Sequence, residues 1–229
     1  MNFGTQSVLD PRLLTRAVAQ RIRAVTFDVG GTLIEPWPSV GHIYAEVAAR
    51  HGVRRPPGEL DARFAAAWHA QSRFGHTRQA WANLVDETFR GLARRPPSET
   101  FFDELYNRFS DPTAWRVFDD VQPALKTLAA RGIKLGIISN WDDRLRPLLR
   151  CLGLARWFDT TVISCEVGYP KPAPPIFAQA AQRLGLPASA ILHVGDSLEN
   201  DVRGARAAGF EALHLRRRRQ PKPLGRRRS

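Results

Sequence analysis

The strongest constraint on the fold is a helix–glycine–strand rhythm that recurs through the C-terminal half of the chain. Glycine just past a helix end supplies the left-handed residue that many helix C-caps need. The short, continuous apolar runs that follow are typical of strands covered on both faces. This alternation predicts an α/β fold, a Rossmann-like parallel sheet with helices on both sides. The predicted pairs are 121–131 with 133–138, 145–152 with 161–164, 176–184 with 190–194, and 202–208 with 210–215.

An earlier strand and a long helical stretch complete the predicted organisation. The apolar, β-branched run Ile22–Phe27 has the character of the later strands, so we assign it to the same sheet. Residues 39–110 break the alternation, because their apolar residues recur at every third and fourth position, as in amphipathic helices. We therefore predict an all-helical insert between the first and second strands, with helices at 41–50, 60–74, 79–92 and 98–109.

Proline-containing segments mark the ends of this insert. Pro36–Pro38 and Asp111–Pro112 are the candidate hinges, because proline cannot continue a helix or a central strand. The predicted parts are an α/β core formed by residues 1–35 and 112–215, the helical insert at 36–111, and a basic, disordered tail at 216–229.

The net charge of +12 at pH 7 invites a nucleic-acid hypothesis, but its distribution argues against one. Eight positive charges follow Leu215 with no acidic residue among them, which leaves +4 on the rest of the chain. Such a run, interspersed with proline and glycine, is typical of a solvated tail. We expect no specific nucleic-acid interface, and loose, salt-sensitive binding of polyanions by the tail is the alternative.

Cysteine usage and hydropathy restrict where such a chain works. Cys151 and Cys165 form neither a disulfide framework nor the spacing of a zinc site, so both are expected to be reduced thiols. No apolar run approaches the ~18 residues of a membrane span, and residues 1–23 do not resemble a secretory signal. By elimination we expect a cytoplasmic protein with no membrane partner; the sequence does not indicate an oligomeric state.

Polar residues come directly after three of the predicted strands. These are Asp28, Ser139 and Asp196. Because ligands bind at the carboxyl ends of the strands in such sheets, the three side chains are expected to converge on one rim. Lys171, between two prolines, and Asp201 add a cation and a further carboxylate. Together these residues predict a site for an anionic substrate and a divalent metal.

Four segments also match the motifs of a known superfamily. They are Asp28–Leu33 with its glycine turn, Ile137–Asn140 with its terminal Ser-Asn, Lys171, and the acidic segment Gly195–Asp201. In this order the chain resembles the haloacid dehalogenase superfamily of hydrolases over nearly all of residues 22–215. The resemblance implies that the helical insert is a cap of the first type over the active site.

The resemblance further implies a role for each site residue. Asp28 is the expected nucleophile, which forms a covalent aspartyl intermediate. Ser139 is expected to donate its hydroxyl to the transferring phosphoryl group, and Lys171 to neutralise the nucleophile and the phosphoryl oxygens. The expected cofactor is Mg²⁺, with Asp201 orienting Lys171 or a metal-bound water. The implied sets are Asp28, Gly30 (through its carbonyl), Asp196 and Asp201 for the metal, and Gly31, Thr32, Ser139, Asn140 and Lys171 for the phosphate.

One position departs from the pattern of the superfamily's phosphatases. Those enzymes carry a second aspartate two residues after the nucleophile, which protonates the leaving group and then activates water; here the position is Gly30. General acid–base help of this kind contributes about 10²–10⁴ in rate. The candidates for a substitute acid are Glu35, His42 and His76.

Three functional hypotheses follow. The first is a Mg²⁺-dependent phosphatase of small phosphorylated metabolites, which uses a substitute acid or acts on substrates with good leaving groups. The second is a non-phosphatase hydrolase, for example a dehalogenase-like enzyme. Asp196 makes the fourth motif one of the metal-binding kind, which disfavours dehalogenation. The absence of lysine from 39–110 disfavours phosphonate cleavage. The third is a phosphate-binding or regulatory protein with weak turnover. Trp37 and Trp141 lie near the expected rim, where they either stack on a ligand or pack.

Overall fold

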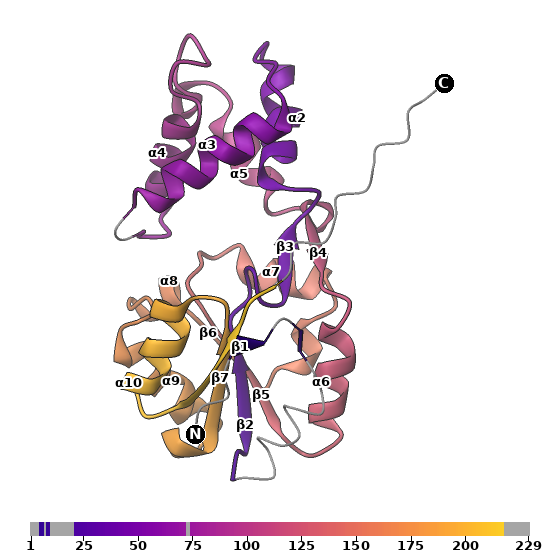
Figure 1. Ribbon diagram of the computed structural model, residues 1–229, viewed down its shortest axis with the longest axis vertical. Helices are drawn as coiled ribbons and strands as arrows, with labels where there is room; N and C mark the ends of the chain where they lie inside the picture. The colour runs from indigo at the N-terminus through magenta and orange to yellow at the C-terminus, as the bar shows by residue number, and fades with distance from the viewer. Residues whose placement is uncertain (1–4, 7, 10–20, 72–73, 218–229) are drawn as a thin grey trace.

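A six-stranded parallel sheet forms the centre of the larger part of the molecule (Figure 1). The computed structural model describes residues 5–6, 8–9, 21–71 and 74–217 of the chain. Every neighbouring pair of strands in this sheet is parallel, which confirms the predicted α/β, Rossmann-like fold class. Across the sheet the strands run in the order β1 (Thr5–Gln6), β8 (Glu211–Leu215), β7 (Ile191–Gly195), β2 (Ala24–Phe27), β5 (Lys134–Ser139) and β6 (Thr160–Ile163).

The central strand β2 sets the position of the site. All four of its residues are buried, because β5 and β7 pair with its two edges and apolar clusters cover its two faces. Phe27, its last residue, is level with Ile137 of β5 and Val194 of β7. The polar residues that follow these three strands therefore leave the sheet at the same edge, as expected from the sequence.

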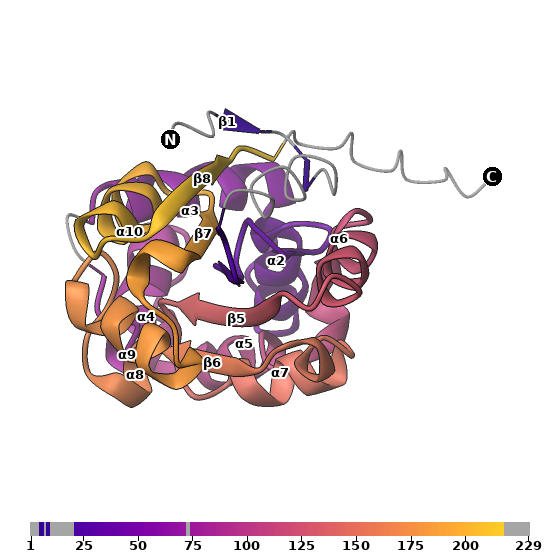
Figure 2. The ribbon, with the colours of Figure 1, turned by 90° about the horizontal axis from the view of Figure 1, so that it is seen from below.

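Alternate strand residues point into two apolar clusters, one on each face of the sheet. Val25 and Phe27 pack with the helices on one face, whereas Ala24 and Ile138 pack with those on the other. Figure 2 shows the two groups of helices on opposite sides of the strands. The first group consists of α6 (Val121–Ala129) and α7 (Leu145–Cys151), and the second of α9 (Pro174–Leu184), the π-helix η5 (Leu198–Arg203) and α10 (Gly204–Ala207).

A helical insert with its own apolar core lies beyond the carboxyl edge of the sheet (Figure 1). Tyr44, Leu60 and Phe89 are among its almost fully buried side chains. Its last helix begins at Phe102 rather than at residue 98, because Thr100 leaves helical geometry (φ −130°, ψ −73°) after a short 3₁₀ turn. The insert consists of α2 (Val40–Arg50), α3 (Pro57–His69), α4 (Arg78–Thr88), η1 (Pro97–Glu99) and α5 (Phe102–Arg108).

Two short antiparallel strands connect the sheet to the insert. The chain leaves through β3 (Ile34–Pro36) and returns through β4 (Trp115–Val117). The candidate hinges at 36–38 and 111–112 lie where this ribbon meets the insert, and the side chain of Ser39 caps α2 immediately afterwards. The ribbon coincides with the boundaries that we predict between core and cap; their division into separate domains stays a prediction.

The two ends of the described chain differ from the prediction. Thr5–Gln6 pairs with β8 as an edge strand, so β2 is the second strand along the chain and not the first. The predicted tail begins too early, because Arg217 donates to the Thr32 carbonyl at 2.6 Å and to Asp120 Oδ2 at 2.5 Å. The tail from residue 218 onward lies outside the described residues. Within the part that the structure describes, no helix is long and apolar enough to cross a membrane.

Candidate active site

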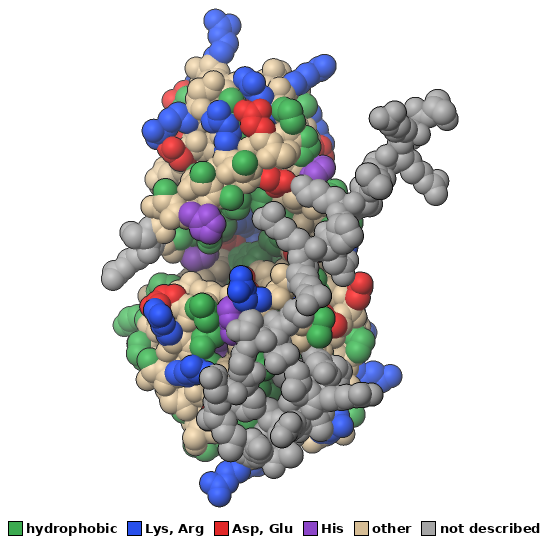
Figure 3. Space-filling view, viewed as in Figure 1, with side chains coloured by type: hydrophobic (Ala, Val, Ile, Leu, Met, Phe, Trp, Pro, Cys, Tyr) green, Lys and Arg blue, Asp and Glu red, His purple; other side chains and the backbone are tan. Residues whose placement is uncertain are grey.

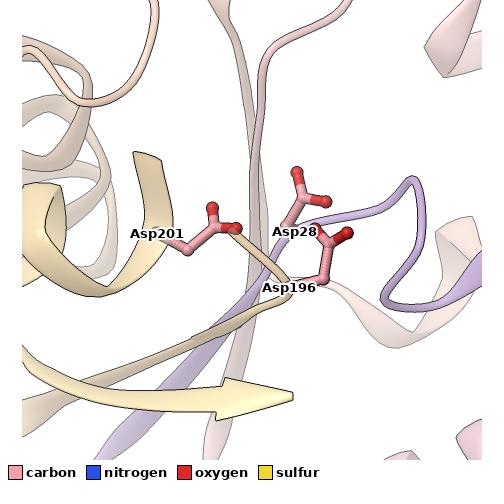
Figure 4. Close-up of side chains that lie close together, drawn as sticks. All are labelled: Asp28, Asp196 and Asp201. Atoms are coloured by element: carbon pink, nitrogen blue, oxygen red, sulfur yellow. The ribbon is translucent and has the colours of Figure 1, made fainter. Parts of the chain in front are cut away.

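The acidic residues predicted at the edge of the sheet converge in the structure (Figure 4). Asp28 follows β2, whereas Asp196 and Asp201 come from the segment after β7. Each offers one carboxylate oxygen, and these oxygens lie within 4.8 Å of one another. Several carboxylates at this spacing suit a hard divalent cation, which prefers oxygen ligands.

One lysine lies inside this cluster. The ammonium group of Lys171 donates to Asp28 Oδ1 at 2.8 Å and to Asp201 Oδ1 at 2.5 Å, and the residue is only 4% exposed. The hydroxyl of Ser139, the last residue of β5, donates to the same oxygen of Asp28 at 3.0 Å. The structure therefore brings the three predicted catalytic residues Asp28, Ser139 and Lys171 into direct contact, and Asp201 holds the lysine from the other side.

The backbone that carries Lys171 is fixed by Asn140. The side-chain amide of Asn140 donates to the Lys171 carbonyl at 2.9 Å, and its side-chain oxygen accepts from the Lys171 N–H at 2.6 Å. This two-sided pairing determines where the lysine side chain starts and hence that it reaches Asp28. Asn140 thus has a positioning role in the structure, while its contact with phosphate stays a prediction.

The turn after Asp28 makes room for a carboxylate. Gly31 has a left-handed backbone (φ +75°), and a Cβ on it would lie 2.5 Å from Asp196 Oδ2. The N–H groups of Gly31 and Thr32 donate to carbonyls of the same turn, at 2.8 and 3.2 Å. These N–H groups therefore close the turn, and Thr32 is fully buried; the expected contact of both residues with phosphate stays a prediction.

One buried titratable group of the site was not predicted. His193 is fully buried in β7, with Nε2 3.2 Å from Asp201 Oδ1 and Nδ1 2.9 Å from the Thr26 hydroxyl. Burial lowers the pKa of His193, so the imidazole is a neutral hydrogen-bonding support for Asp201. The signal in the sequence was a histidine inside an otherwise apolar strand; its register with Thr26 of the central strand is visible only in the structure.

Burial and repulsion set the charges of the cluster. Burial raises the pKa of Asp28, although Lys171 partly offsets the effect. Burial also raises the pKa of Asp196 to about 7, and the carboxylates of Asp28 and Asp201 add to the rise. Although Asp201 is buried, Lys171 and His193 hold its pKa below the usual value. Lys171 pairs with two of the three clustered carboxylates, and a divalent cation would balance the remaining charge.

A cavity of about 1410 Å³ lies between this cluster and the helical insert. Figure 3 shows its mouth as a hollow between the upper and lower parts of the molecule. Asp28, Lys171 and Asp196 lie on its core side. The insert contributes mainly aromatic and aliphatic side chains, which include Tyr44, Phe64, Trp68, Phe74, Trp81, Val85, Leu105, Tyr106 and Phe109.

Comparison with known proteins assigns the family. A model of the haloacid dehalogenase-like hydrolases matches residues 22–209, most of the chain. The chain belongs to this family of hydrolases. It is 38% identical over 205 residues to mouse haloacid dehalogenase-like hydrolase domain-containing protein 3, which covers 84% of this chain and 81% of the mouse protein. The family and the enzyme class predicted from the motifs are therefore confirmed.

Two further relatives carry more specific names. A glyceraldehyde 3-phosphate phosphatase from Methanopyrus kandleri is 39% identical over 106 residues, which is 44% of this chain and 43% of that protein. The crystal structure of a haloacid dehalogenase-type phosphatase from Thermococcus onnurineus superimposes with a TM-score of 0.63 at 27% identity, over 87% of this chain and 89% of the other.

Of the three candidate acids in this hydrolase, His76 alone lines the cavity. Glu35 is paired with the Arg116 guanidinium, and His42 Nδ1 lies 2.7 Å from the Ser39 hydroxyl. His76 Nδ1 is buried without a hydrogen-bond partner among the described residues. Burial lowers the pKa of His76 to about 4, so its imidazole is neutral near pH 7 and carries no proton to spare for a leaving group.

The space beside Gly30 is occupied by an indole. A Cβ at this position would lie 3.1 Å from Cζ3 of Trp141, which lines the cavity and packs on Trp115 with ring centroids 5.3 Å apart. Trp37, the other tryptophan expected at the rim, lies under the Arg116 guanidinium at 3.8 Å and is not part of the cavity wall. Trp141 is thus the rim tryptophan that a ligand can reach.

A junction of hydrogen bonds attaches the insert to the core next to the site. Asp142 accepts from Trp81 Nε1 of α4 at 3.1 Å and from the Tyr106 hydroxyl of α5 at 3.3 Å. Arg144 balances its charge at 2.6 Å, and the guanidinium stacks on the Tyr106 ring at 3.4 Å. These partners were not predicted, because residues 61 and 36 positions apart give no local signal of contact.

Proposed function

We propose that this hydrolase is a Mg²⁺-dependent phosphatase of small phosphorylated metabolites, with Asp28 as the nucleophile. The observation that supports it most strongly is the charge balance, because three carboxylates lie within 4.8 Å of one another and Lys171 pairs with only two of them, Asp28 and Asp201. A phosphate ester brings further negative charge, which a divalent cation would have to offset. The names of the relatives from M. kandleri and T. onnurineus support the phosphoester class.

The donor set fits Mg²⁺, a hard cation that prefers oxygen ligands. Asp28 and Asp196 would hold it through carboxylate oxygens, and Gly30 through its backbone carbonyl. Both oxygens of Asp201 already accept hydrogen bonds, at 2.5 and 2.9 Å, so this residue would act on the surroundings of the ion instead of binding it directly. When bound, the ion would reduce the repulsion between Asp28 and the phosphoryl oxygens.

The residues of the chain divide the remaining work. An oxygen of Asp28 attacks phosphorus, and the bond from phosphorus to the leaving oxygen breaks as the aspartyl phosphate forms. Lys171 neutralises the attacking carboxylate, and the Ser139 hydroxyl can turn from Asp28 to a phosphoryl oxygen. Gly30 provides no acid, so the leaving oxygen departs with its electron pair and without a proton. Water then cleaves the aspartyl phosphate and releases inorganic phosphate.

The lack of a side chain at Gly30 also favours a second candidate function. A protein that binds phosphate compounds and turns them over weakly would keep Lys171 and the carboxylates but need no acid. Mg²⁺ and phosphate analogues would then bind without product formation. Turnover of activated substrates separates the two candidates.

The test is hydrolysis of acetyl phosphate and p-nitrophenyl phosphate with Mg²⁺. The leaving groups of both compounds depart readily without protonation by an acid. Phosphate release should be lost in Asp28→Asn and in excess EDTA. Asp119→Asn, which removes an exposed carboxylate of the core, is the matched control and should retain the wild-type rate. A folded wild-type protein that binds Mg²⁺ but releases no phosphate from either compound would contradict the phosphatase and favour the binding protein.

A further inference from the structure

We propose that the leaving-group side of the cavity takes an aromatic hydroxyl, so that the substrates are aryl phosphate monoesters. This inference rests on the proposed phosphatase function and names the substrate class of the same site. Two features that arise in different parts of the chain lead to it. One is an aromatic wall in the helical insert, and the other is a nucleophile with no acid beside it.

The aromatic wall consists of rings that contact one another and stay partly open to the cavity. Trp68 stacks on Trp81 with centroids 5.9 Å apart and an interplanar angle of 21°, and Phe74 meets Trp81 edge-on at 4.6 Å. All three line the cavity and are only half-buried, unlike Phe89 in the interior of the insert. Rings exposed in this way offer offset stacking and edge contacts to a further ring.

The insert side of the wall offers little to a charged group. No charged side chain of the insert, within its described residues, lines the cavity. On the core side, Arg144 is already neutralised by Asp142 at 2.6 Å and covered by the Tyr106 ring. The described part of the insert also contributes two polar side chains to the wall, Gln71 and His76, and the buried Nδ1 of His76 could hydrogen-bond a polar substituent of the ligand. A planar apolar group therefore gains most from leaving water here.

The nucleophile selects for the same group on chemical grounds. Gly30 has no side chain, and Trp141 occupies the adjoining space at 3.1 Å, so the leaving oxygen departs unprotonated. An aromatic hydroxyl such as that of tyrosine has a pKa near 10, whereas that of water, a guide for aliphatic hydroxyls, is about 15.7. As the Asp28 oxygen bonds to phosphorus, the aryl oxygen leaves with its electron pair as an aryloxide, which solvent then protonates.

The first experiment compares phenyl phosphate with cyclohexyl phosphate, which has a ring of similar size but an aliphatic oxygen. We expect kcat/KM to be at least about 10²-fold higher for phenyl phosphate, the lower range of what a general acid contributes. The second experiment uses Trp68→Leu, which should raise KM for phenyl phosphate about three- to tenfold, as expected for a lost ring contact. Acetyl phosphate has no ring to stack on the wall, so its hydrolysis should be unaffected. Trp157→Leu, outside the cavity, is the matched control.

The outcomes separate this inference from the function on which it rests. Equal kcat/KM for the two ring compounds, with Asp28-dependent hydrolysis of acetyl phosphate, would overturn the aryl preference and leave the phosphatase in place. A preference for phenyl phosphate that Trp68→Leu leaves unchanged would also overturn it, because the wall would then have no part in selection. If the wild-type protein does not hydrolyse acetyl phosphate either, both the aryl preference and the phosphatase function are overturned.

A binding measurement covers the case in which Trp68→Leu does not fold. Phenylphosphonate and methylphosphonate cannot be hydrolysed by this route, and calorimetry on the wild-type protein with Mg²⁺ gives their affinities directly. Tighter binding of phenylphosphonate, by about three- to tenfold, supports an aromatic subsite. Equal affinities would overturn it.

Discussion

Ring atom Cζ3 of Trp141 lies 3.1 Å from the point where a β-carbon on Gly30 would stand. The contact joins the turn after β2 to the segment after β5, two neighbours in the sheet. Any side chain at position 30 requires the indole to shift by a few tenths of an ångström. Two residues therefore keep an acid away from Asp28 at this position. Gly30 has no side chain, and Trp141 lies in the space that a side chain would need.

This contact leads to a prediction for the missing acid. Gly30→Asp alone should raise hydrolysis of alkyl phosphates only slightly, because Trp141 restricts the new carboxyl group. The double variant Gly30→Asp with Trp141→Leu should give the larger gain, up to about 10²–10⁴ in kcat. Steady-state kinetics on cyclohexyl phosphate, with Trp141→Leu as the control, measure the difference. An equal gain in the single and double variants would show that the indole moves aside without cost.

Lys171 is predicted to support stability as well as catalysis. Lys171→Met leaves Asp28 and Asp201 buried without their shared partner, and loss of one member of a buried ion pair costs about 3–5 kcal/mol. The thermal midpoint, measured in EDTA, should fall sharply, and phosphate release, measured separately with Mg²⁺, should be lost. Lys126→Met, at an exposed position of α6, is the control and should change neither. A midpoint unchanged in Lys171→Met would contradict the buried pairing.

The rule that polar residues follow strands predicted the convergence of the site. Asp28, Ser139 and Asp196 each follow or end an apolar run, and parallel strands place such positions at one edge of the sheet. The contact between Lys171 and Asp28 came from the superfamily motifs, because no local pattern relates residues 143 positions apart. Sequence reasoning thus predicted which residues converge, while their functional roles stay predictions.

Features that depend on backbone angles or on long-range side-chain contacts were not predictable in the same way. The N–H of Gly31 is used inside the turn because of its left-handed backbone, which the sequence allows but does not require. The pairing of Trp81 with Asp142 depends on how the insert is placed over the core. The same placement brings His76 into the cavity wall and leaves Glu35 and His42 out of it.

His76 predicts a pH dependence of stability. Burial lowers its pKa from the ordinary 6.5 to about 4, so between these values the unfolded chain takes up a proton that the folded chain does not. The stability contributed by neutral His76 is complete above pH 6.5 and is lost as the pH falls towards 4. His76→Asn removes this loss and suits the left-handed backbone at this position (φ 51°). As the pH is lowered from 6.5 towards 4, the thermal midpoint measured in EDTA should therefore fall less steeply for His76→Asn than for the wild-type protein.

The control for this prediction is His69→Asn, at an exposed position of the same insert, which should keep the wild-type slope. Other titrating groups, such as Asp196 and His193, are present in all three proteins, so the difference between the slopes reports on His76. Identical slopes for wild type and His76→Asn would show that this imidazole titrates as it does in the unfolded chain.

The hydrogen bond from Trp81 Nε1 to Asp142 Oδ2, 3.1 Å long, predicts that the insert is held closed by the indole nitrogen. Trp81→Phe keeps a ring in the wall but removes the bond, which is worth about 1 kcal/mol, or a factor of about 5 in the balance between closed and open forms. The variant should show a larger radius of gyration in small-angle scattering and faster proteolysis at the β3–β4 ribbon. Trp115→Phe is a matched control, because its indole nitrogen bonds the Phe109 carbonyl at 3.0 Å, at the insert's own end of the ribbon. If both variants opened equally, closure of the insert would not depend on the hydrogen bond to Asp142. Opening confined to Trp81→Phe would show that Trp81 both forms part of the aromatic wall and stabilises the closed form.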